Sequence, residues 1–591
     1  MNIEQSLKTA IQEALLALFQ IEEDVVLQPT KKDFEGNYTY VVFPLVKSLR
    51  KNPAELGNAI GQFIQERNDF VSSFNVVQGF LNIVLNDSVW IDTLNAILAN
   101  DSFGVLPSNG QSVMVEFSSP NTNKPLHLGH LRNNFLGASV SNILTAGGFD
   151  VAKTCLVNDR GVHICKSMLA YQKYGNGATP ESLGIKGDHL AGKYYVEFDK
   201  AYKAEISQLM AEGKTEDEAK KTAPLMLETQ EMLQKWEQGD AETMALWRKM
   251  NDWVFAGFAE TYKKIGVSFD KVYYESNTYL LGKDVVEEGL KNGIFFKKEN
   301  GSVWIDLKEE GLDEKLVLRA DGTSVYITQD LGTTDLKFND YHNDKSIWVV
   351  GNEQDYHFQV LFAIMKKLGR AYADGCYHLS YGMVDLPSGK MKSREGTVVD
   401  ADELVAEMIE TAAETTRERG KIADFSKEEA ENLFQMLALG ALKYFLLKVE
   451  PKKRMLFNPA ESIDFQGNTG PFIQYTHARI CSILRKAASL NVPINKQVKT
   501  VDLLKPESEL IYLLNEYPII IQKACNDYSP AVIANYIYEL AKTFNQFYAE
   551  VSIMNETDSD KQQFRLSLIK TVAETIRKAM GLLGIQVPTQ M

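Results

Sequence analysis

The stretch Val115–Asn133, VEFSSPNTNKPLHLGHLRN, decides how this chain is interpreted. An apolar run typical of a β-strand ends at Phe117, a turn rich in Ser, Pro and Asn follows, and a helix is expected to begin near His127. A strand that leads through a turn into a helix is typical of doubly wound α/β folds, in which the helix N-terminus binds an anion at the carboxyl edge of a parallel sheet. The stretch therefore predicts a phosphate site at the start of this helix.

Four positions of the stretch converge on that helix end. His127 and His130 are three residues apart and share one helical face, and Lys124 adds a positive charge in the preceding loop. Gly129 lacks a side chain, so a base or ribose can approach the backbone closely. An isolated H-x-G-H is more often half of a metal site or a pair of surface residues. The surrounding S-S-P-N-x-x-K-P favours the phosphate site, because its polar groups all point to one helix end.

His127-Leu128-Gly129-His130 resembles the HIGH signature of class I aminoacyl-tRNA synthetases, and the longer stretch resembles the form found in the arginine-specific family. The resemblance implies that the two histidines and a lysine hold the ATP phosphates while pyrophosphate leaves. In this mechanism the enzyme positions ATP and stabilises the charge on its α-phosphate, and no covalent enzyme intermediate is required. Mg²⁺ is expected only as the counter-ion of ATP, and no structural metal site is expected.

A second motif, Gly389–Gly396 with the sequence GKMKSREG, resembles the KMSKS loop of the same class. By itself it is a short basic loop, for which a solvated surface loop is the common explanation. The resemblance implies that four of its residues bind ATP, namely Lys390, Met391, Lys392 and Ser393. Ser393 stands where the second lysine of KMSKS is usual. Lys124, Lys390 and Lys392 are therefore open alternatives for the group that neutralises the α-phosphate.

A site for arginine needs carboxylates in a fork geometry and an aromatic wall, because the guanidinium is planar and permanently charged. Positions that match the family's arginine site occur in chain order: Glu116, Asn121, His127, Tyr326, Asp330 and Gln354. The resemblance implies that Glu116, Tyr326 and Asp330 hold the guanidinium, while the other three hold the amine and the carboxylate. The alternative is that the two acids are ordinary helix-capping or surface residues.

The chain as a whole predicts an α/β protein with a Rossmann-like, doubly wound catalytic domain. Strands are predicted at 112–117, 152–157, 324–328 and 346–351, with a tight turn at Asp321-Gly322 before the third. Residues 1–106 are expected to form a small N-terminal α/β domain, 107–455 the catalytic domain and 456–591 an all-helical domain. The catalytic part is expected to contain a charged helical insertion near 180–250 and a helical connector after 400.

The two ends of the chain resemble the RNA-binding parts of the same family. Phe472, Tyr475 and Arg479 form one helical stripe of two rings and a cation, a combination that stacks on unpaired bases, although such a stripe is more often part of a core. The resemblance implies that this stripe and Met591 contact the anticodon. It also implies that Asn37, in the N-terminal domain, contacts the outer corner of the tRNA near the D-loop.

Composition limits the classes of protein that remain. A net charge of −15 and a pI near 5.2 argue against a general nucleic-acid coat protein, while leaving room for a local basic face. Five cysteines without a C-x-x-C pair predict a reducing, cytoplasmic location, and no apolar run is long enough for a membrane span.

The resemblance implies an ATP-dependent arginine–tRNA ligase that acts on tRNA(Arg) and L-arginine. It also implies that the enzyme activates arginine only with tRNA bound and that it is a monomer.

Two rival functions remain open at this point. One is a class I ligase for another amino acid, or a small nucleotidyltransferase, since HIGH-like loops serve both. The other is a non-catalytic tRNA-binding relative, which is expected to have lost the phosphate-site residues that are present here.

Overall fold

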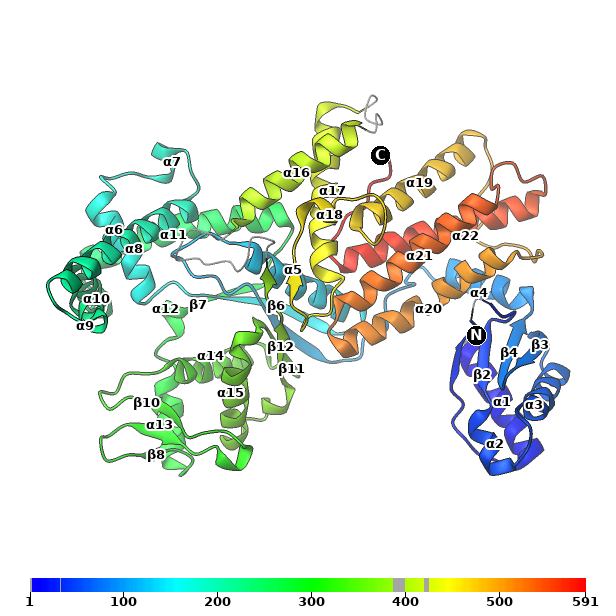
Figure 1. Ribbon diagram of the computed structural model, residues 1–591, viewed down its shortest axis with the longest axis horizontal. Coiled ribbons are helices and arrows are strands. Elements are labelled where there is room, and N and C mark those ends of the chain that lie inside the picture. Colours follow the sequence, from blue (N-terminus) through cyan, green and yellow to red (C-terminus); the bar gives the residue numbers. More distant parts are fainter. Residues whose placement is uncertain (1–2, 32, 386–398, 419–424) are drawn as a thin grey trace.

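The computed structural model describes residues 3–31, 33–385, 399–418 and 425–591 (Figure 1). Within these residues, the middle of the molecule contains a five-stranded parallel sheet with the order β12-β11-β5-β6-β7. Its strands are β5 (Ser112–Glu116), β6 (Asp150–Val157), β7 (Lys271–Tyr274), β11 (Lys345–Gly351) and β12 (Cys376–Tyr381). The chain first moves outward from β5 to β7 and then returns to the other side of β5. The strand order therefore reverses between β5 and β11, and the predicted doubly wound fold is confirmed.

The predicted strands at 112–117, 152–157 and 346–351 are present as β5, β6 and β11. The predicted strand at 324–328 is wrong, because a helix, α14 (Tyr326–Tyr341), begins there. Ile327 and Leu331 are both buried at helical spacing, and Gly332 lies against the start of α13 (Gly282–Lys291). Tertiary packing of this helix overrides the strand preference of the local sequence.

Between β7 and β11 lies a separate lobe with its own hydrophobic core. Its antiparallel sheet, in the described residues, consists of β8 (Phe296–Lys297), β9 (Val303–Ile305) and β10 (Lys315–Leu318). Helices α13, α14 and α15 (Asp355–Lys367) cover it. The turn predicted at Asp321-Gly322 is present, with Gly322 at φ +79° and the Arg319 N–H donating to the Thr323 carbonyl at 3.0 Å.

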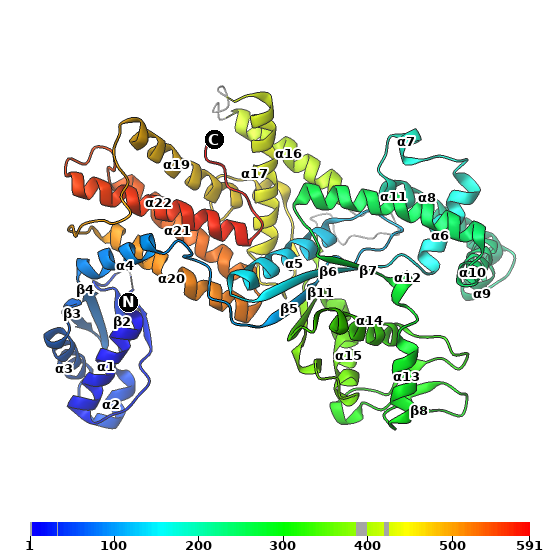
Figure 2. The same cartoon turned by 180° about the vertical axis from the view of Figure 1, so that it is seen from behind.

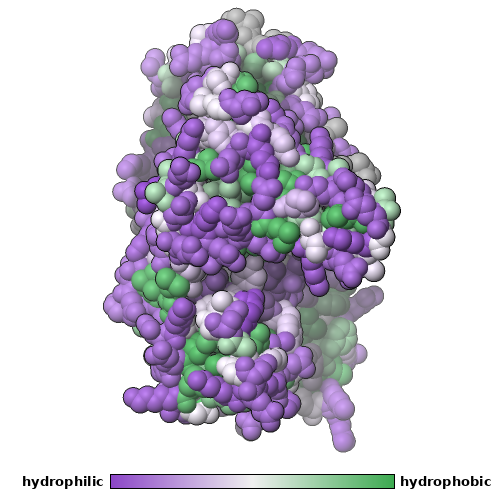
Figure 3. Space-filling model, turned by 90° about the vertical axis from the view of Figure 1, so that its left-hand side faces the viewer, coloured by the Kyte–Doolittle hydropathy of each residue, from purple (hydrophilic) through white to green (hydrophobic). Residues whose placement is uncertain are grey.

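The helical insertion lies between β6 and β7 and forms one end of the molecule (Figures 1 and 2). Its helices are α6 (Val162–Tyr174), α7 (Pro180–Leu183), α8 (Gly187–Ala211), α9 (Glu216–Thr222), α10 (Pro224–Glu237) and α11 (Ala241–Ile265). Ion pairs between residues four apart occupy its outer faces, for example Lys203–Asp199 at 2.7 Å and Lys235–Glu231 at 2.8 Å. Hydrophilic residues predominate on this end of the molecule, and apolar residues form small separate patches (Figure 3).

The N-terminal region is a four-stranded antiparallel sheet with helices, as far as the described residues extend. Its elements are α1 (Ile3–Phe19), β1 (Leu27–Pro29), β2 (Tyr38–Val41), α2 (Phe43–Leu49), α3 (Pro53–Arg67), β3 (Val71–Val77), β4 (Phe80–Leu85) and α4 (Asp87–Ala99). Asn95 on α4 exchanges two hydrogen bonds with the backbone of Val498, at 2.8 and 3.0 Å, so this region is joined directly to the C-terminal helices.

The C-terminal part is helical: α16 (Ala401–Glu418), α17 (Lys427–Leu447), α18 (Pro459–Ser462), α19 (Gly470–Ser489), α20 (Lys505–Asp527), α21 (Pro530–Glu550) and α22 (Ser559–Leu582). One short strand that the sequence did not predict, β14 (Met455–Leu456), pairs with β13 (Val384–Asp385). Helix α5 (Leu128–Ala146) packs against the sheet on one side and against helices of this bundle on the other. Across the described ranges, no helix is both long and apolar enough to cross a membrane.

Candidate active site

The predicted phosphate site is a helix N-terminus capped by two histidines. His127 is the N-cap of α5, and its Nδ1 accepts a hydrogen bond from the Gly129 N–H at 3.1 Å. The Nδ1 of His130 accepts the N–H of His127 at 3.2 Å, which completes a reciprocal capping box. Since both Nδ1 atoms accept, a neutral ring carries its proton on Nε2. The cap therefore presents two neutral N–H donors, with ring centroids 4.0 Å apart, at the positive end of a helix dipole.

Electrostatics keep these rings neutral. Burial and, to a smaller extent, the nearby Lys124 ammonium lower the pKa of His127 to about 3. Burial, His127 and Lys124 hold the pKa of His130 well below its ordinary value. Both imidazoles are therefore uncharged at neutral pH and act as hydrogen-bond donors through Nε2.

The turn before the helix is held in an uncommon backbone conformation. Ser118 and Ser119 have φ angles of +76° and +45°, values that non-glycine residues rarely adopt. Asn133 on α5 stabilises this turn, because its side-chain oxygen accepts the Ser118 N–H at 2.5 Å and its amide donates to the Val349 carbonyl at 2.7 Å. Asn133 thus ties the end of β5 to β11 at the point where the strand order reverses. It was not among the predicted site residues.

The residues predicted to bind arginine lie at the carboxyl edge of the sheet and in the neighbouring lobe. Glu116 is the last residue of β5, is buried, and pairs with Lys337 on α14. Asp330, also on α14, accepts a hydrogen bond from His357 Nε2 at 2.6 Å. The backbone of Asn121 lies beside that of Asn158, just past the end of β6. Glu116 and Asn121 therefore lie at the carboxyl edge of the sheet, whereas Asp330 lies on a helix of the lobe.

Two more of the predicted arginine ligands, Tyr326 and Gln354, are exposed. Tyr326 is the first residue of α14 and is 78% exposed. Gln354 ends the short 3₁₀ turn Asn352–Gln354 that directly follows β11. Tyr326 and Asp330 are one turn apart on the same helix, whereas the sequence had predicted Tyr326 to lie on a strand.

Two further acids, Asp159 and Glu275, were not predicted; Glu275 interacts electrostatically with both Asp159 and Asp330. Asp159 follows β6 and accepts two hydrogen bonds from Ser276, at 2.8 Å from its N–H and 2.6 Å from its hydroxyl. Glu275 follows β7 directly. Burial raises its pKa to about 7; Arg160 opposes this shift, and Asp159 and Asp330 add to it. An acid within two residues of the end of a parallel strand is the signal that would have indicated both residues.

Lys124 and His127 line a cavity of about 480 Å³ that is closed on its other side by helix α8, including His189 and Lys193. The predicted basic loop, with Lys390, Met391, Lys392 and Ser393, lies outside the described residues. The structure resumes at Val399, whose carbonyl accepts the Leu128 N–H at 3.1 Å. The segment after the loop therefore lies directly against the histidine cap.

Comparisons with known proteins cover the chain in three consecutive parts. The family description "Arginyl tRNA synthetase N terminal domain" matches residues 2–85, "tRNA synthetases class I (R), catalytic domain" matches 93–458, and "DALR anticodon binding domain" matches 473–591. The chain is 57% identical over 596 residues to the arginine–tRNA ligase of Amoebophilus asiaticus and 55% identical to that of Bacteroides thetaiotaomicron, with all of each chain covered. The chain belongs to the arginyl-tRNA synthetase family.

Solved structures of the family share the fold. The arginyl-tRNA synthetase of Thermus thermophilus superposes with a TM-score of 0.80 at 24% identity, over the whole of both chains. That of Plasmodium falciparum gives 0.77 at 20% identity, over all of this chain and 99% of the other. The predicted architecture of a class I catalytic domain between a small N-terminal domain and a helical C-terminal domain is confirmed.

In the C-terminal helices of this family member, Phe472, Tyr475 and Arg479 lie half-buried on α19. The Arg479 guanidinium carbon lies 4.9 Å from the Tyr475 ring centroid and 5.2 Å from that of Tyr548 on α21. Phe472 packs against Tyr538, also on α21, with 5.7 Å between centroids. The stripe therefore contributes to the packing of the two helices and also remains partly accessible.

The C-terminal tail runs beside the same helix. His477 and Arg485 on α19 contact the carbonyls of Pro588 and Thr589 at 2.9 and 2.7 Å, which brings Met591 to this side of the bundle. In the N-terminal region the Asn37 side chain accepts the Leu85 N–H at 2.8 Å, so it also stabilises the end of β4. The predicted RNA contacts of these residues stay predictions.

Proposed function

We propose that the site at the reversal between β5 and β11 activates L-arginine with ATP and then transfers it to the terminal adenosine of tRNA(Arg). Membership of the family makes the chain an aminoacyl-tRNA synthetase, an arginine–tRNA ligase. The observation that supports the proposal most is the neutral histidine cap of α5 beside a group of acids at the same sheet edge.

In the first step, the arginine carboxylate attacks the α-phosphorus of ATP and pyrophosphate leaves. The Nε2–H groups of His127 and His130 donate hydrogen bonds to phosphate oxygens, and the N-terminal dipole of α5 stabilises the negative charge. Lys124, close enough to depress the pKa of both rings, supplies a positive charge on the same side. Lys390, Met391, Lys392 and Ser393 are proposed to contact ATP from the basic loop.

Specificity for arginine is proposed to come from carboxylates. Glu116, Asp330 and the aromatic ring of Tyr326 are assigned to the guanidinium, with Glu275 and Asp159 adding negative charge nearby. Asn121, His127 and Gln354 are assigned to the amine and carboxylate of the substrate. Buried or half-buried carboxylates reject a neutral side chain strongly, since an unmatched charge remains in the site.

In the second step, the 2′-hydroxyl of the terminal adenosine attacks the arginyl carbonyl and AMP leaves. We propose that tRNA binding is required for the first step as well. Phe472, Tyr475, Arg479 and Met591 are assigned to the anticodon and Asn37 to the outer corner of the tRNA. The proposed domains are residues 1–106, 107–455 and 456–591. The proposed active form is a cytoplasmic monomer.

Mg²⁺ is proposed to enter with ATP as its counter-ion. The histidine cap and Lys124 offer ring N–H donors and an ammonium, which suit phosphate oxygens and are poor ligands for Mg²⁺. The carboxylates of Glu197 and Asp400 line the same cavity. The phosphates themselves are proposed as the ligands of the ion.

The test is ATP–pyrophosphate exchange with arginine, lysine or citrulline, each with and without tRNA(Arg). Exchange with arginine alone among the three, and only when tRNA is present, is the expected result. Citrulline has nearly the shape of arginine without its charge, so equal exchange with citrulline would contradict the carboxylate assignment. Exchange without tRNA would remove the tRNA requirement while leaving the arginine site in place.

A further inference from the structure

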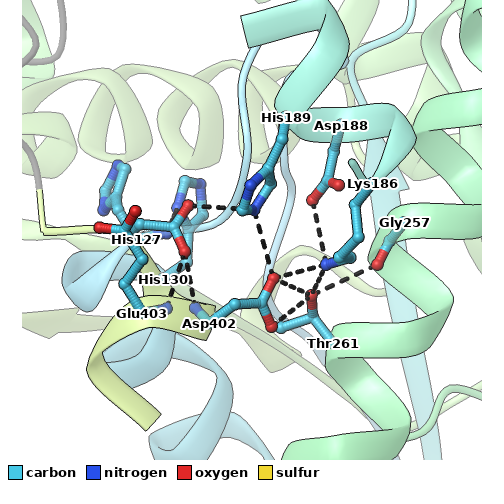
Figure 4. A network of polar contacts seen from close by, with 10 residues as sticks. His127, His130, Lys186, Asp188, His189, Gly257, Thr261, Asp402 and Glu403 are labelled. Atoms are coloured by element: carbon cyan, nitrogen blue, oxygen red, sulfur yellow. Dashed lines mark hydrogen bonds and ion pairs between the residues drawn. The ribbon is translucent and has the colours of Figure 1, made fainter. Parts of the chain in front are cut away.

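Side chains from three helices meet beside the histidine cap (Figure 4). Lys186 precedes α8 of the insertion, Thr261 lies on α11, and Asp402 lies in the first turn of α16. Lys186 Nζ is 2.5 Å from Asp402 Oδ2 and donates to Thr261 Oγ1 at 2.6 Å. Thr261 Oγ1 donates to the Asp402 carboxylate at 3.2 Å. Asp402 thus joins two helices of the insertion to the helix that follows the basic loop.

His189, on the first turn of α8, adds a second connection to α16. Its Nε2 lies 3.4 Å from Asp402 Oδ2 and 3.3 Å from Asp400 Oδ2. Asp400 caps α16, because its Oδ1 accepts the N–H groups of Asp402 at 2.8 Å and Glu403 at 3.1 Å. The four side chains Lys186, His189, Thr261 and Asp402 are called the clasp below.

The clasp continues directly into the active site. Residues 399–401 lie antiparallel to 126–128, with the Leu128 N–H donating to the Val399 carbonyl at 3.1 Å and the Ala401 N–H to the Leu126 carbonyl at 3.0 Å. Asp400 is therefore the bridge partner of His127. The extended backbone of His127, φ −138°, is what allows its ring to cap α5.

A metal ion is the obvious alternative ligand for this cluster, since Asp188, His189 and Asp402 have donor atoms within 4.8 Å of one another. The Lys186 ammonium, however, lies 3.5 Å from Asp188 and 2.5 Å from Asp402. It already supplies a positive charge to both carboxylates, and a divalent cation would be repelled by it. The geometry is that of a structural ion-pair network.

We propose that Asp402 is a positioning residue for arginine activation: through the clasp and residues 399–401 it holds His127 in its capping position. The inference rests on the proposed function, because it concerns the same phosphate site. It adds that the helical insertion, remote in sequence from the histidines, determines how well they are aligned. Asp402 itself contacts neither substrate nor reacting atoms in this assignment.

The test is Asp402→Asn in the full-length protein, which preserves shape and removes the charge. The turnover of arginine-dependent exchange is expected to fall about tenfold or more, because small misplacements of catalytic groups have effects of this size. The KM for arginine should change much less than the turnover, since Glu116 and Asp330, which are assigned to the guanidinium, are untouched. The loss should disappear in a His127→Asn background, because a residue that acts through His127 has nothing left to position.

Asp199→Asn is the matched control, because Asp199 lies on α8 and pairs with the exposed Lys203 at 2.7 Å; it should behave as wild type. His189→Gln, which retains an N–H donor, should recover much of the activity that His189→Ala loses. If Asp402→Asn does not fold, His189→Ala and His189→Gln take its place, and each is measured alone and in the His127→Asn background. Unchanged turnover in Asp402→Asn would overturn the proposal. So would a double variant with His127→Asn whose loss of turnover equals the product of the two single losses. Absence of exchange in the wild type would instead refute the proposed function.

Discussion

Lys337 and Glu116 form an ion pair in which the two side chains are only 2% and 7% exposed. Glu116 ends the central strand β5 and Lys337 lies near the end of α14, with its ammonium also 5.5 Å from the Tyr273 ring centroid. The pair joins the parallel sheet to the lobe that carries Asp330. The Lys337 ammonium, buried inside the protein, thus balances the charge of the Glu116 carboxylate at the edge of the sheet.

The first prediction concerns the stability of this pair. Lys337→Met leaves the Glu116 carboxylate buried without a partner, and breaking a buried pair in this way costs about 3–5 kcal/mol. The free energy of unfolding from urea denaturation should fall by this order, while Lys337→Arg should retain most of it. Lys203→Met, which removes an exposed pair on α8, serves as the control and should have a much smaller effect. Equal midpoints for Lys337→Met and wild type would contradict the prediction.

The second prediction concerns the guanidinium. Asp330→Asn should raise the KM for arginine about 10- to 100-fold, because a charge-assisted hydrogen bond contributes about 1.5–3 kcal/mol. The KM for ATP should not change, and both constants come from exchange assays with tRNA present. Asp313→Asn, an exposed acid of the same lobe, is the control. An unchanged arginine KM in the Asp330 variant would refute the assignment of Asp330.

The third prediction concerns pH. Since the pKa of Glu275 is raised to about 7, this group is largely protonated below pH 7 and ionised above it. Arginine is positively charged throughout and binds better to the ionised form. Its affinity should therefore rise as pH increases from 6 to 8, with proton release on binding near pH 7. Calorimetry in buffers of different ionisation enthalpy measures both effects, and Glu275→Gln should flatten the pH dependence. A flat wild-type profile would place Glu275 outside the arginine site.

The fourth prediction concerns the α-phosphate. Lys124→Ala should lower the exchange rate about 100-fold or more, since removal of one electrostatic contact to the transition state has effects of this order. Lys203→Ala on α8 is the surface control. Near-normal exchange in the Lys124 variant would shift the role to Lys390 or Lys392, which the same assay can test.

Local sequence was sufficient for the features that depend on neighbouring residues. The strand, turn and helix start at Val115–Asn133 follow from apolar spacing and capping chemistry, and all three are present. The central strands β5, β6 and β11 were also predicted. Of the described strands of the parallel sheet, β7 and β12 were not. These are its two edges, where the apolar runs typical of buried parallel strands are weaker.

The sequence by itself determined the fold class, the family and the order of the candidate residues along the chain. Only the tertiary structure decided which of them meet. The start of α14 has strand-like residues and is a helix because Ile327 and Leu331 pack into the lobe. The ion pair of Lys337 with Glu116, the electrostatic interaction of Glu275 with Asp330 and the bridge of Asp400 with His127 join elements far apart in the chain. Such contacts depend on which surfaces are buried and on how whole helices pack against the sheet. The spacing of residues within one segment does not specify either.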